Sequence, residues 1–270
     1  MIPKLIHYSW FSGEPFPQNI KNFISTWKKF LPDYEFMLWD MSSLKRINNT
    51  FANEAVSVRK WAFAADFIRA YAVYTYGGIW FDTDIEVFKS FDPFLKDRMF
   101  IGMEANFHER PKKRYLTAHV FGAEKGHPFL KDCLEYYKNR HFISADSNKL
   151  PLEMCFDMTL MPEILSKIAV AKYGYNNDGY QDKEQILKEG IHVYPSDYFD
   201  APRYKSMKRV VSIHRVLGSW RTNTNTDIEK NNFTDTDPYN KWSLRYVIYI
   251  IYDNLNAFLT KYFHINIIKV

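Results

Sequence analysis

The chain has 270 residues, 46% of them hydrophobic, and a formal net charge of +5, which fits one large globular domain with at most a small appendage. Its two cysteines form no C-x-x-C pair and no apolar run approaches the about 20 residues that span a bilayer, so we expect neither a zinc motif nor a membrane span. The basic residues are scattered and match no nucleic-acid motif, so the predicted partners are anionic small molecules or an anionic membrane surface, not nucleic acid.

The first 40 residues predict a β-α-β unit. Residues 5–10 are apolar enough for a buried strand, 20–30 carry apolar side chains at helical spacing, and 34–39 alternate as a strand does. A helix between two strands favours a parallel pair, because the crossover returns the chain in the same direction. We therefore expect an α/β fold.

The clearest helix is predicted over residues 61–76. Gly77 and Gly78 follow it, and a glycine there is typical of a left-handed C-cap. A short apolar strand over 79–81 then leads directly into Asp82-Thr83-Asp84.

After the triplet, some stretches of the sequence give a clear pattern and others do not. Residues 144–190 give no clear pattern, 221–238 are rich in Asn and Thr and predict a loop, and 242–263 predict a final aromatic-rich helix. Further strands are expected at 85–88, 100–104, 120–123, 191–194 and 210–214, and a further helix at 128–139.

The D-x-D triplet at 82–84 is the central chemical feature. Two carboxylates at a strand end can converge on one divalent cation, and hard oxygen ligands suit Mg²⁺ or Mn²⁺. Such an ion can stabilise a diphosphate leaving group. The triplet alone is also compatible with a solvated turn.

Asp66 and Arg69 lie three residues apart on the predicted 61–76 helix and hence on one face. Their neighbours are apolar, so both charges are expected to be partly buried and in need of partners. Two interpretations stay open: a structural ion pair, or a polar clamp on a sugar and its phosphate.

Four blocks in order resemble glycosyltransferase family thirty-two, the sugar-nucleotide transferases of surface polysaccharide pathways and fungal mannosylation. They are IPKLIHYSWFSG at 2–13, TWKKFLPDYE at 26–35, AADFIRAYAVYTYGGIWFDTDIEV at 64–87 and IHRVLGSW at 213–220. The same pattern is more distantly similar to the glucosyltransferase domain of the large clostridial toxins.

The resemblance implies roles for the donor side of a site. Trp10 is expected to stack on the nucleobase, Asp66 and Arg69 to hold the sugar, and Trp80 to line the donor pocket. Asp157 falls where related enzymes place a polar sugar contact.

The resemblance also implies the metal side. Asp84 is expected to ligate the ion directly, and Asp82 to contact the metal, the ribose or the sugar. His214 is a candidate third ligand or phosphate contact, against a structural role. Ser219 and Trp220 are expected to close over the diphosphate and exclude water.

Two further side chains are judged from position alone. His7 lies inside the first predicted strand, and we expect it to be packed in the core. Glu86 follows the triplet and is either a support for the metal ligands or an exposed strand residue.

The fold implied is a GT-A-type, Rossmann-like mixed sheet flanked by helices, with a C-terminal helical appendage. Residues 1–240 would form the catalytic domain and 241–270 an amphipathic helix. That helix either contacts the inner face of a membrane or packs on protein. The start of the chain is too quickly polar for a signal peptide, so a cytoplasmic location is expected.

The resulting hypothesis is a retaining glycosyltransferase that uses Mn²⁺ or Mg²⁺ and a nucleotide sugar, with UDP-sugars favoured. Its acceptor would be a surface glycan on a polyprenyl-diphosphate carrier. The alternatives are a transferase that modifies a protein, a non-catalytic sugar-nucleotide-binding module, and a phosphatase or nuclease. The complete Asp66, Arg69, Asp82 and Asp84 set disfavours the binding module. The sequence offers neither the nucleophile nor the second metal cluster that a phosphatase or nuclease needs.

Overall fold

The computed structural model describes residues 1–105, 113–146, 149, 154–179, 182–200 and 208–217. The predicted loop at 221–238, the helix at 242–263, the appendage at 241–270, Ser219 and Trp220 lie outside these residues. Within the described part, no helix is both long and apolar enough to cross a membrane.

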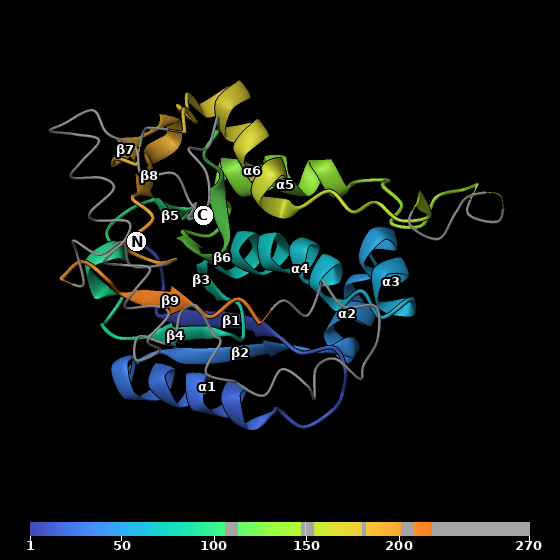
Figure 1. Cartoon of the computed structure of the whole chain (residues 1–270), viewed down its shortest axis with the longest axis horizontal. Helices are drawn as coiled ribbons and strands as arrows, with labels where there is room; N and C mark the ends of the chain where they lie inside the picture. The colour runs from blue at the N-terminus through green and yellow to red at the C-terminus, as the bar shows by residue number, and fades with distance from the viewer. Residues whose placement is uncertain (106–112, 147–148, 150–153, 180–181, 201–207, 218–270) are drawn as a thin grey trace, which may run out of the picture. The chain divides into compact units, whose positions relative to one another are not determined.

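A mixed sheet forms the centre of the fold, and the predicted α/β class is confirmed (Figure 1). Its seven strands in the described residues run in the order β2-β1-β3-β6-β5-β8-β7, and β4 and β9 pair separately. The strands are β1 Leu5–Ser9, β2 Glu35–Trp39, β3 Gly78–Phe81, β4 Ile85–Val87, β5 Met99–Met103, β6 Leu116–Ala123, β7 Gln185–Ile186, β8 Ile191–Tyr194 and β9 Ser212–His214.

Strand direction decides which side chains meet at one edge of the sheet. β1 is parallel to β2 and β3, as the β-α-β pattern predicts, and β5 is parallel to β8. β6 is antiparallel to both β3 and β5. The carboxyl ends of β3, β5 and β8 therefore lie at the same edge as the start of β6.

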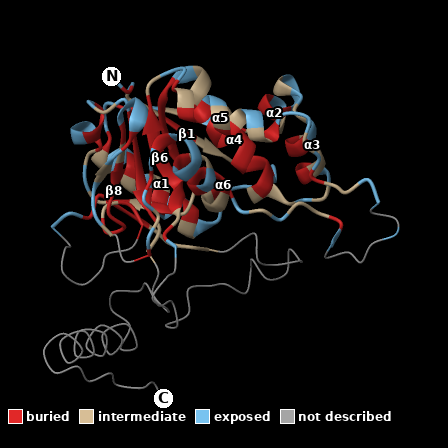
Figure 2. Ribbon diagram, turned by 90° about the horizontal axis from the view of Figure 1, so that it is seen from above, coloured by how far each residue is buried: buried red, intermediate tan, exposed pale blue. Residues whose placement is uncertain are grey.

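Helices cover both faces of the sheet. Figure 1 shows α1 on one side of β1 and β2, with α4, α5 and α6 on the other. Each face buries its own apolar cluster, and the central strands are the most buried elements (Figure 2). The helices are α1 Gln18–Phe30, α2 Met41–Ile47, α3 Thr50–Ser57, α4 Trp61–Tyr76, α5 Pro128–Tyr137 and α6 Met161–Ile168, which a π-helical turn Ala169–Tyr173 extends.

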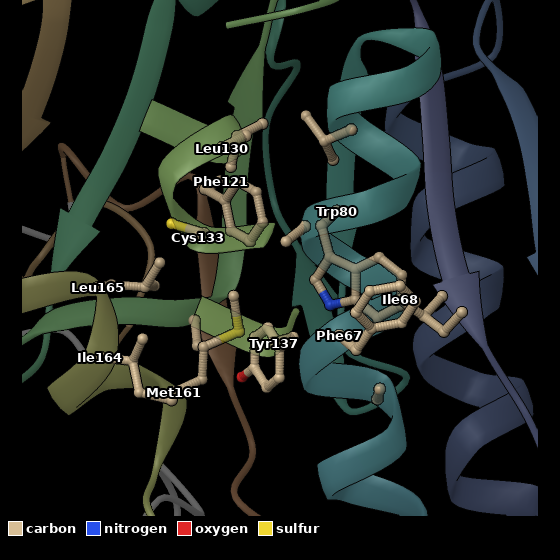
Figure 3. Packing of buried hydrophobic residues seen from close by; sticks show 14 of the residues in the cluster. Phe67, Ile68, Trp80, Phe121, Leu130, Cys133, Tyr137, Met161, Ile164 and Leu165 are labelled. Atoms are coloured by element: carbon tan, nitrogen blue, oxygen red, sulfur yellow. The ribbon is translucent and has the colours of Figure 1, made fainter. Parts of the chain in front are cut away.

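Helix α4 carries the packing that positions the site. Phe67 and Ile68 on α4 lie beside Trp80 of β3, while Tyr137 of α5 faces them across the core (Figure 3). The Trp80 side chain is fully buried. Burial of such aromatic groups contributes on the order of 2–3 kcal/mol each, so the β3–α4 contact is held firmly.

The turn from α4 into β3 differs from the predicted left-handed cap. Gly77 has φ 70° and ψ −176°, and Gly78 has φ 105°, so neither adopts the left-handed helical conformation. Glycine is nevertheless required, because a Cβ on Gly78 would lie 2.4 Å from the carbonyl oxygen of Leu5. The close approach lets β1 pair with β3 directly below the D-x-D triplet.

Candidate functional site

The D-x-D triplet leaves the sheet at the carboxyl end of β3. The Asp82 amide donates to the His119 carbonyl at 3.0 Å, and Ile85 closes a turn back onto the Asp82 carbonyl at 3.1 Å. β4 then pairs with β9 in a register that places Ile85 opposite His214. This pairing brings a histidine about 130 residues away in sequence to the side of Asp84.

Asp82, Asp84 and His214 form a group whose ligand atoms all lie within 4.8 Å of one another. His214 Nε2 is 3.4 Å from Asp84 Oδ1. Two carboxylates and an imidazole are ligands that divalent cations such as Mn²⁺ accept, so the donor set fits the metal that the family resemblance implies. The three residues are those named from the sequence as metal ligands, and the structure brings them together.

Arg69, on helix α4, forms ion pairs with the carboxylates of Asp66 and Asp82. Its guanidinium lies 3.1 Å from Asp66 Oδ1 and 3.3 Å from Asp82 Oδ1, and it also donates to the Ala118 carbonyl at 2.6 Å. Asp66 is 8% exposed and Arg69 4%. These contacts place Arg69 as a bridge between α4, β3 and β6, while sugar contact by Asp66 and Arg69 stays a prediction.

Burial sets the protonation of these groups. It raises the pKa of Asp66 to about 7, with Arg69 opposing the rise and Asp82 adding to it. Burial likewise raises the pKa of Asp82 against the opposing charge of Arg69. Although burial alone would lower the pKa of His214, the charge of Asp84 raises it to about 9.

Trp80 reaches the site through a hydrogen bond. Its indole N–H donates to Asp82 Oδ1 at 2.7 Å, and the Arg69 guanidinium lies 5.5 Å from the ring centre. The ring itself is fully buried, and its expected place in the wall of the donor pocket stays a prediction. The hydrogen bond lets Trp80 orient Asp82.

Trp10 lies just beyond the carboxyl end of β1 and is partly exposed. Its N–H donates to the Glu14 carbonyl at 2.6 Å and its ring lies 5.0 Å from that of Phe16. A face that is not fully covered is compatible with stacking on a base, which stays a prediction.

The remaining sequence candidates have structural partners. His7 is fully buried, as expected, accepts from Trp39 Nε1 at 3.2 Å and faces the Gly77 carbonyl at 2.8 Å. Glu86 pairs with Arg215 next to the site. Asp157 pairs with Arg140 at 2.7 Å and caps Thr159, contacts that serve the loop around it.

Sequence reasoning missed three side chains at the same edge. Glu104 follows β5, His119 lies within β6 beside the end of β3, and Asp200 follows β8. Burial and the neighbouring charge of Asp200 raise the pKa of Glu104 to about 8, and burial raises that of Asp200 to about 6. No local spacing links these residues, because only the pairing of β5 with β6 and with β8 brings them together.

Residues 17–101 match the family model described as "Glycosyltransferase sugar-binding region containing DXD motif". The chain is 30% identical over 149 residues to inositol phosphoceramide mannosyltransferase 3 of Schizosaccharomyces pombe. It is 28% identical over 157 residues to mannosyltransferase 1 of the same name and organism. Each match covers 52% of this chain, but only 40% and 45% of the two relatives, so the chain spans less than half of their length.

Among solved structures, the chain is similar to the PaToxG glycosyltransferase at 18% identity and a TM-score of 0.44, over 63% of this chain and 70% of that one. It is also similar to the galactosyltransferase LgtC at 10% identity and a TM-score of 0.36, over 78% and 86%.

The family match contains Asp66, Arg69, Trp80, Asp82 and Asp84. It covers α1 through most of β5, the part of the fold that builds the D-x-D edge of the sheet. The predicted resemblance is thus confirmed: residues 17–101 match the glycosyltransferase sugar-binding region that contains the DXD motif.

Proposed function

We propose that this protein is a metal-dependent, retaining glycosyltransferase that moves a sugar from a nucleotide donor to a glycan acceptor. The observation that carries the proposal is the Asp82, Asp84 and His214 cluster at the carboxyl end of β3. Its two aspartates lie inside the region that matches the glycosyltransferase family. Ligands of α/β folds bind at this end of the strands.

The chain's own residues prepare the site before a donor binds. Trp80 N–H and Arg69 fix Asp82, and the β4–β9 pairing holds His214 against Asp84. Mn²⁺ or Mg²⁺ held by Asp82, Asp84 and His214 would supply the positive charge that stabilises a departing nucleoside diphosphate. Preorganised carboxylates avoid the cost of assembling the site at the moment of reaction.

The donor has two candidates. The toxin-like position of Trp10 favours a UDP-sugar, because that resemblance places a tryptophan on the nucleobase. The names of the two relatives favour a mannosyl donor. There are likewise two candidate acceptors. The family resemblance favours a surface glycan on a polyprenyl-diphosphate carrier, and the names of the two relatives favour a lipid with an inositol phosphate headgroup. Both acceptors fit work at the inner face of a membrane, with residues 241–270 as the proposed contact.

The test is slow hydrolysis of a panel of UDP- and GDP-sugars, with Mn²⁺ and with EDTA. We expect one donor to be hydrolysed only with the metal, and the released sugar to keep its anomeric configuration by NMR. Asp84→Asn should lower the rate at least about 100-fold. Asp92→Asn is the matched control, since Asp92 is an exposed carboxylate paired with Lys4 away from the site.

Hydrolysis of every donor at the same rate in EDTA would contradict a metal-dependent transferase. Failure of every donor, together with absent metal-dependent nucleotide binding, would favour a non-catalytic binding module. An inverted product would leave the metal site standing and refute retention alone.

A further inference from the structure

The buried ring nitrogen Nε2 of His119 has no hydrogen-bond partner among the residues that the structure describes. The residue is 4% exposed. The ring also has a hydrogen bond with the Phe199 backbone that favours the protonated ring, which points to the carbonyl as acceptor and to Nδ1–H as donor. That bond fixes the tautomer and leaves the Nε2 lone pair free, as in histidines that ligate metals.

Asp200 presents an oxygen to the same place. The Ala105 amide donates to Asp200 Oδ2 at 2.5 Å, which orients the carboxylate. Asp200 Oδ1 then lies 3.7 Å from His119 Nε2 and 4.0 Å from His214 Nδ1. The His119 and His214 rings stack with centroids 4.1 Å apart.

These distances are those of a nearly formed coordination site. Ligands about 2.0–2.1 Å from a tetrahedral ion lie about 3.4 Å from one another. The observed separations of 3.7 and 4.0 Å exceed this by a few tenths of an ångström, an adjustment that side-chain rotation supplies. His119, Asp200 and His214 all place a ligand atom within 4.8 Å of the others.

We propose that His119 Nε2, Asp200 Oδ1 and His214 Nδ1 form a second cation site, which lies beside the Asp82–Asp84 pair and shares His214 with it. Two imidazoles and one carboxylate suit Zn²⁺ or a similar transition metal, whereas the oxygen-rich cluster suits Mn²⁺ or Mg²⁺. The site goes beyond the proposed transferase function, which needs one cation only.

His214 lies between the two sites, with Nε2 toward Asp84 and Nδ1 toward Asp200. A neutral imidazole carries one lone pair, so it ligates one ion at a time. Zinc in the second site therefore takes His214 from the first and weakens Mn²⁺ binding there. We therefore expect the two metals to compete for His214, although Asp82 and Asp84 ligate only the first ion and Asp200 only the second.

The test is zinc binding to the metal-free full chain by calorimetry, together with the visible spectrum of Co²⁺, and it needs no sugar donor. We expect one equivalent that survives Asp84→Asn and weakens at least about 100-fold in His119→Gln. Asp200→Asn should weaken it similarly while still accepting from Ala105, which keeps the test valid if His119→Gln does not fold.

His192→Gln is the matched control, because His192 also contacts two carboxylates, Asp97 and Glu184. Unchanged zinc affinity in folded His119→Gln and Asp200→Asn would overturn the proposal. So would loss of the equivalent in His192→Gln or in Asp84→Asn alone, since zinc would then occupy a surface site or the D-x-D cluster.

Discussion

Replacement of Arg69 by methionine should lower the free energy of unfolding far more than the loss of one surface charge would. Arg69 is 4% exposed and faces Asp66 and Asp82 at 3.1 and 3.3 Å. Methionine fills similar volume but leaves both carboxylates without their partner and the Ala118 carbonyl without a donor. Breaking a buried ion pair from one side costs about 3–5 kcal/mol.

Urea unfolding followed by circular dichroism measures this loss. For a folded unit of this size, 3–5 kcal/mol corresponds to a fall in Tm of roughly 6–20 °C in a thermal scan. Arg98→Met is the matched control, because Arg98 pairs with Glu124 and Glu189 on the surface and should lose less than about 1 kcal/mol.

A double variant separates charge from packing. Adding Asp66→Asn to Arg69→Met removes one of the stranded carboxylates, so it should restore part of the lost stability. A loss below about 1 kcal/mol for Arg69→Met, or equal losses for Arg69→Met and Arg98→Met, would refute the view that Arg69 neutralises this edge of the sheet.

Three further predictions concern single side chains. Trp80→Phe removes the N–H bond to Asp82, so donor hydrolysis should fall about tenfold with a loss of about 1–2 kcal/mol in stability. The matched control Trp39→Phe should lose stability but not rate. Because burial lowers the pKa of His7 to about 4, below its unfolded value, the stability tied to neutral His7 is complete above about pH 6.5. This stability is lost as the pH falls toward 4, and the loss reaches about 2 kcal/mol near pH 5. The difference in unfolding free energy between wild type and His7→Gln should therefore depend on pH below about 6.5 and be constant at neutral pH. Asp84→Asn should abolish the fall in donor hydrolysis that EDTA causes in the wild type, because little metal-dependent rate remains to be lost.

Local periodicity predicted the elements that carry the D-x-D triplet. The β1–α1–β2 unit and α4 followed by β3 have long apolar patterns ended by proline or glycine, so their type and order could be read directly. The short helices α2 and α3 were missed, although Asp40 and Asn49 accept from Ser43 and Ala52 as N-caps. Helices of 7 and 8 residues give too few apolar repeats to stand out.

The site residues also divide into those that local sequence predicts and those that only strand pairing brings together. Asp82 and Asp84 are neighbours in sequence, so their convergence follows from one strand end. His214 entered only through the family resemblance, since β9 must pair with β4 before it reaches Asp84. His119 and Asp200 escaped because their meeting depends on strand order and on the antiparallel register of β6, neither of which a local pattern encodes.

The most direct test of the central claim is calorimetric binding of UDP and GDP to the wild type and to Asp84→Asn, each with Mn²⁺ and with EDTA. The site described here predicts that the wild type binds one of the two nucleotides in Mn²⁺ at least about 100-fold more tightly than in EDTA. It also predicts that Asp84→Asn loses this gain. Equal affinity in Mn²⁺ and EDTA, or a metal gain that Asp84→Asn retains, would contradict a nucleotide-sugar site built on the D-x-D cluster.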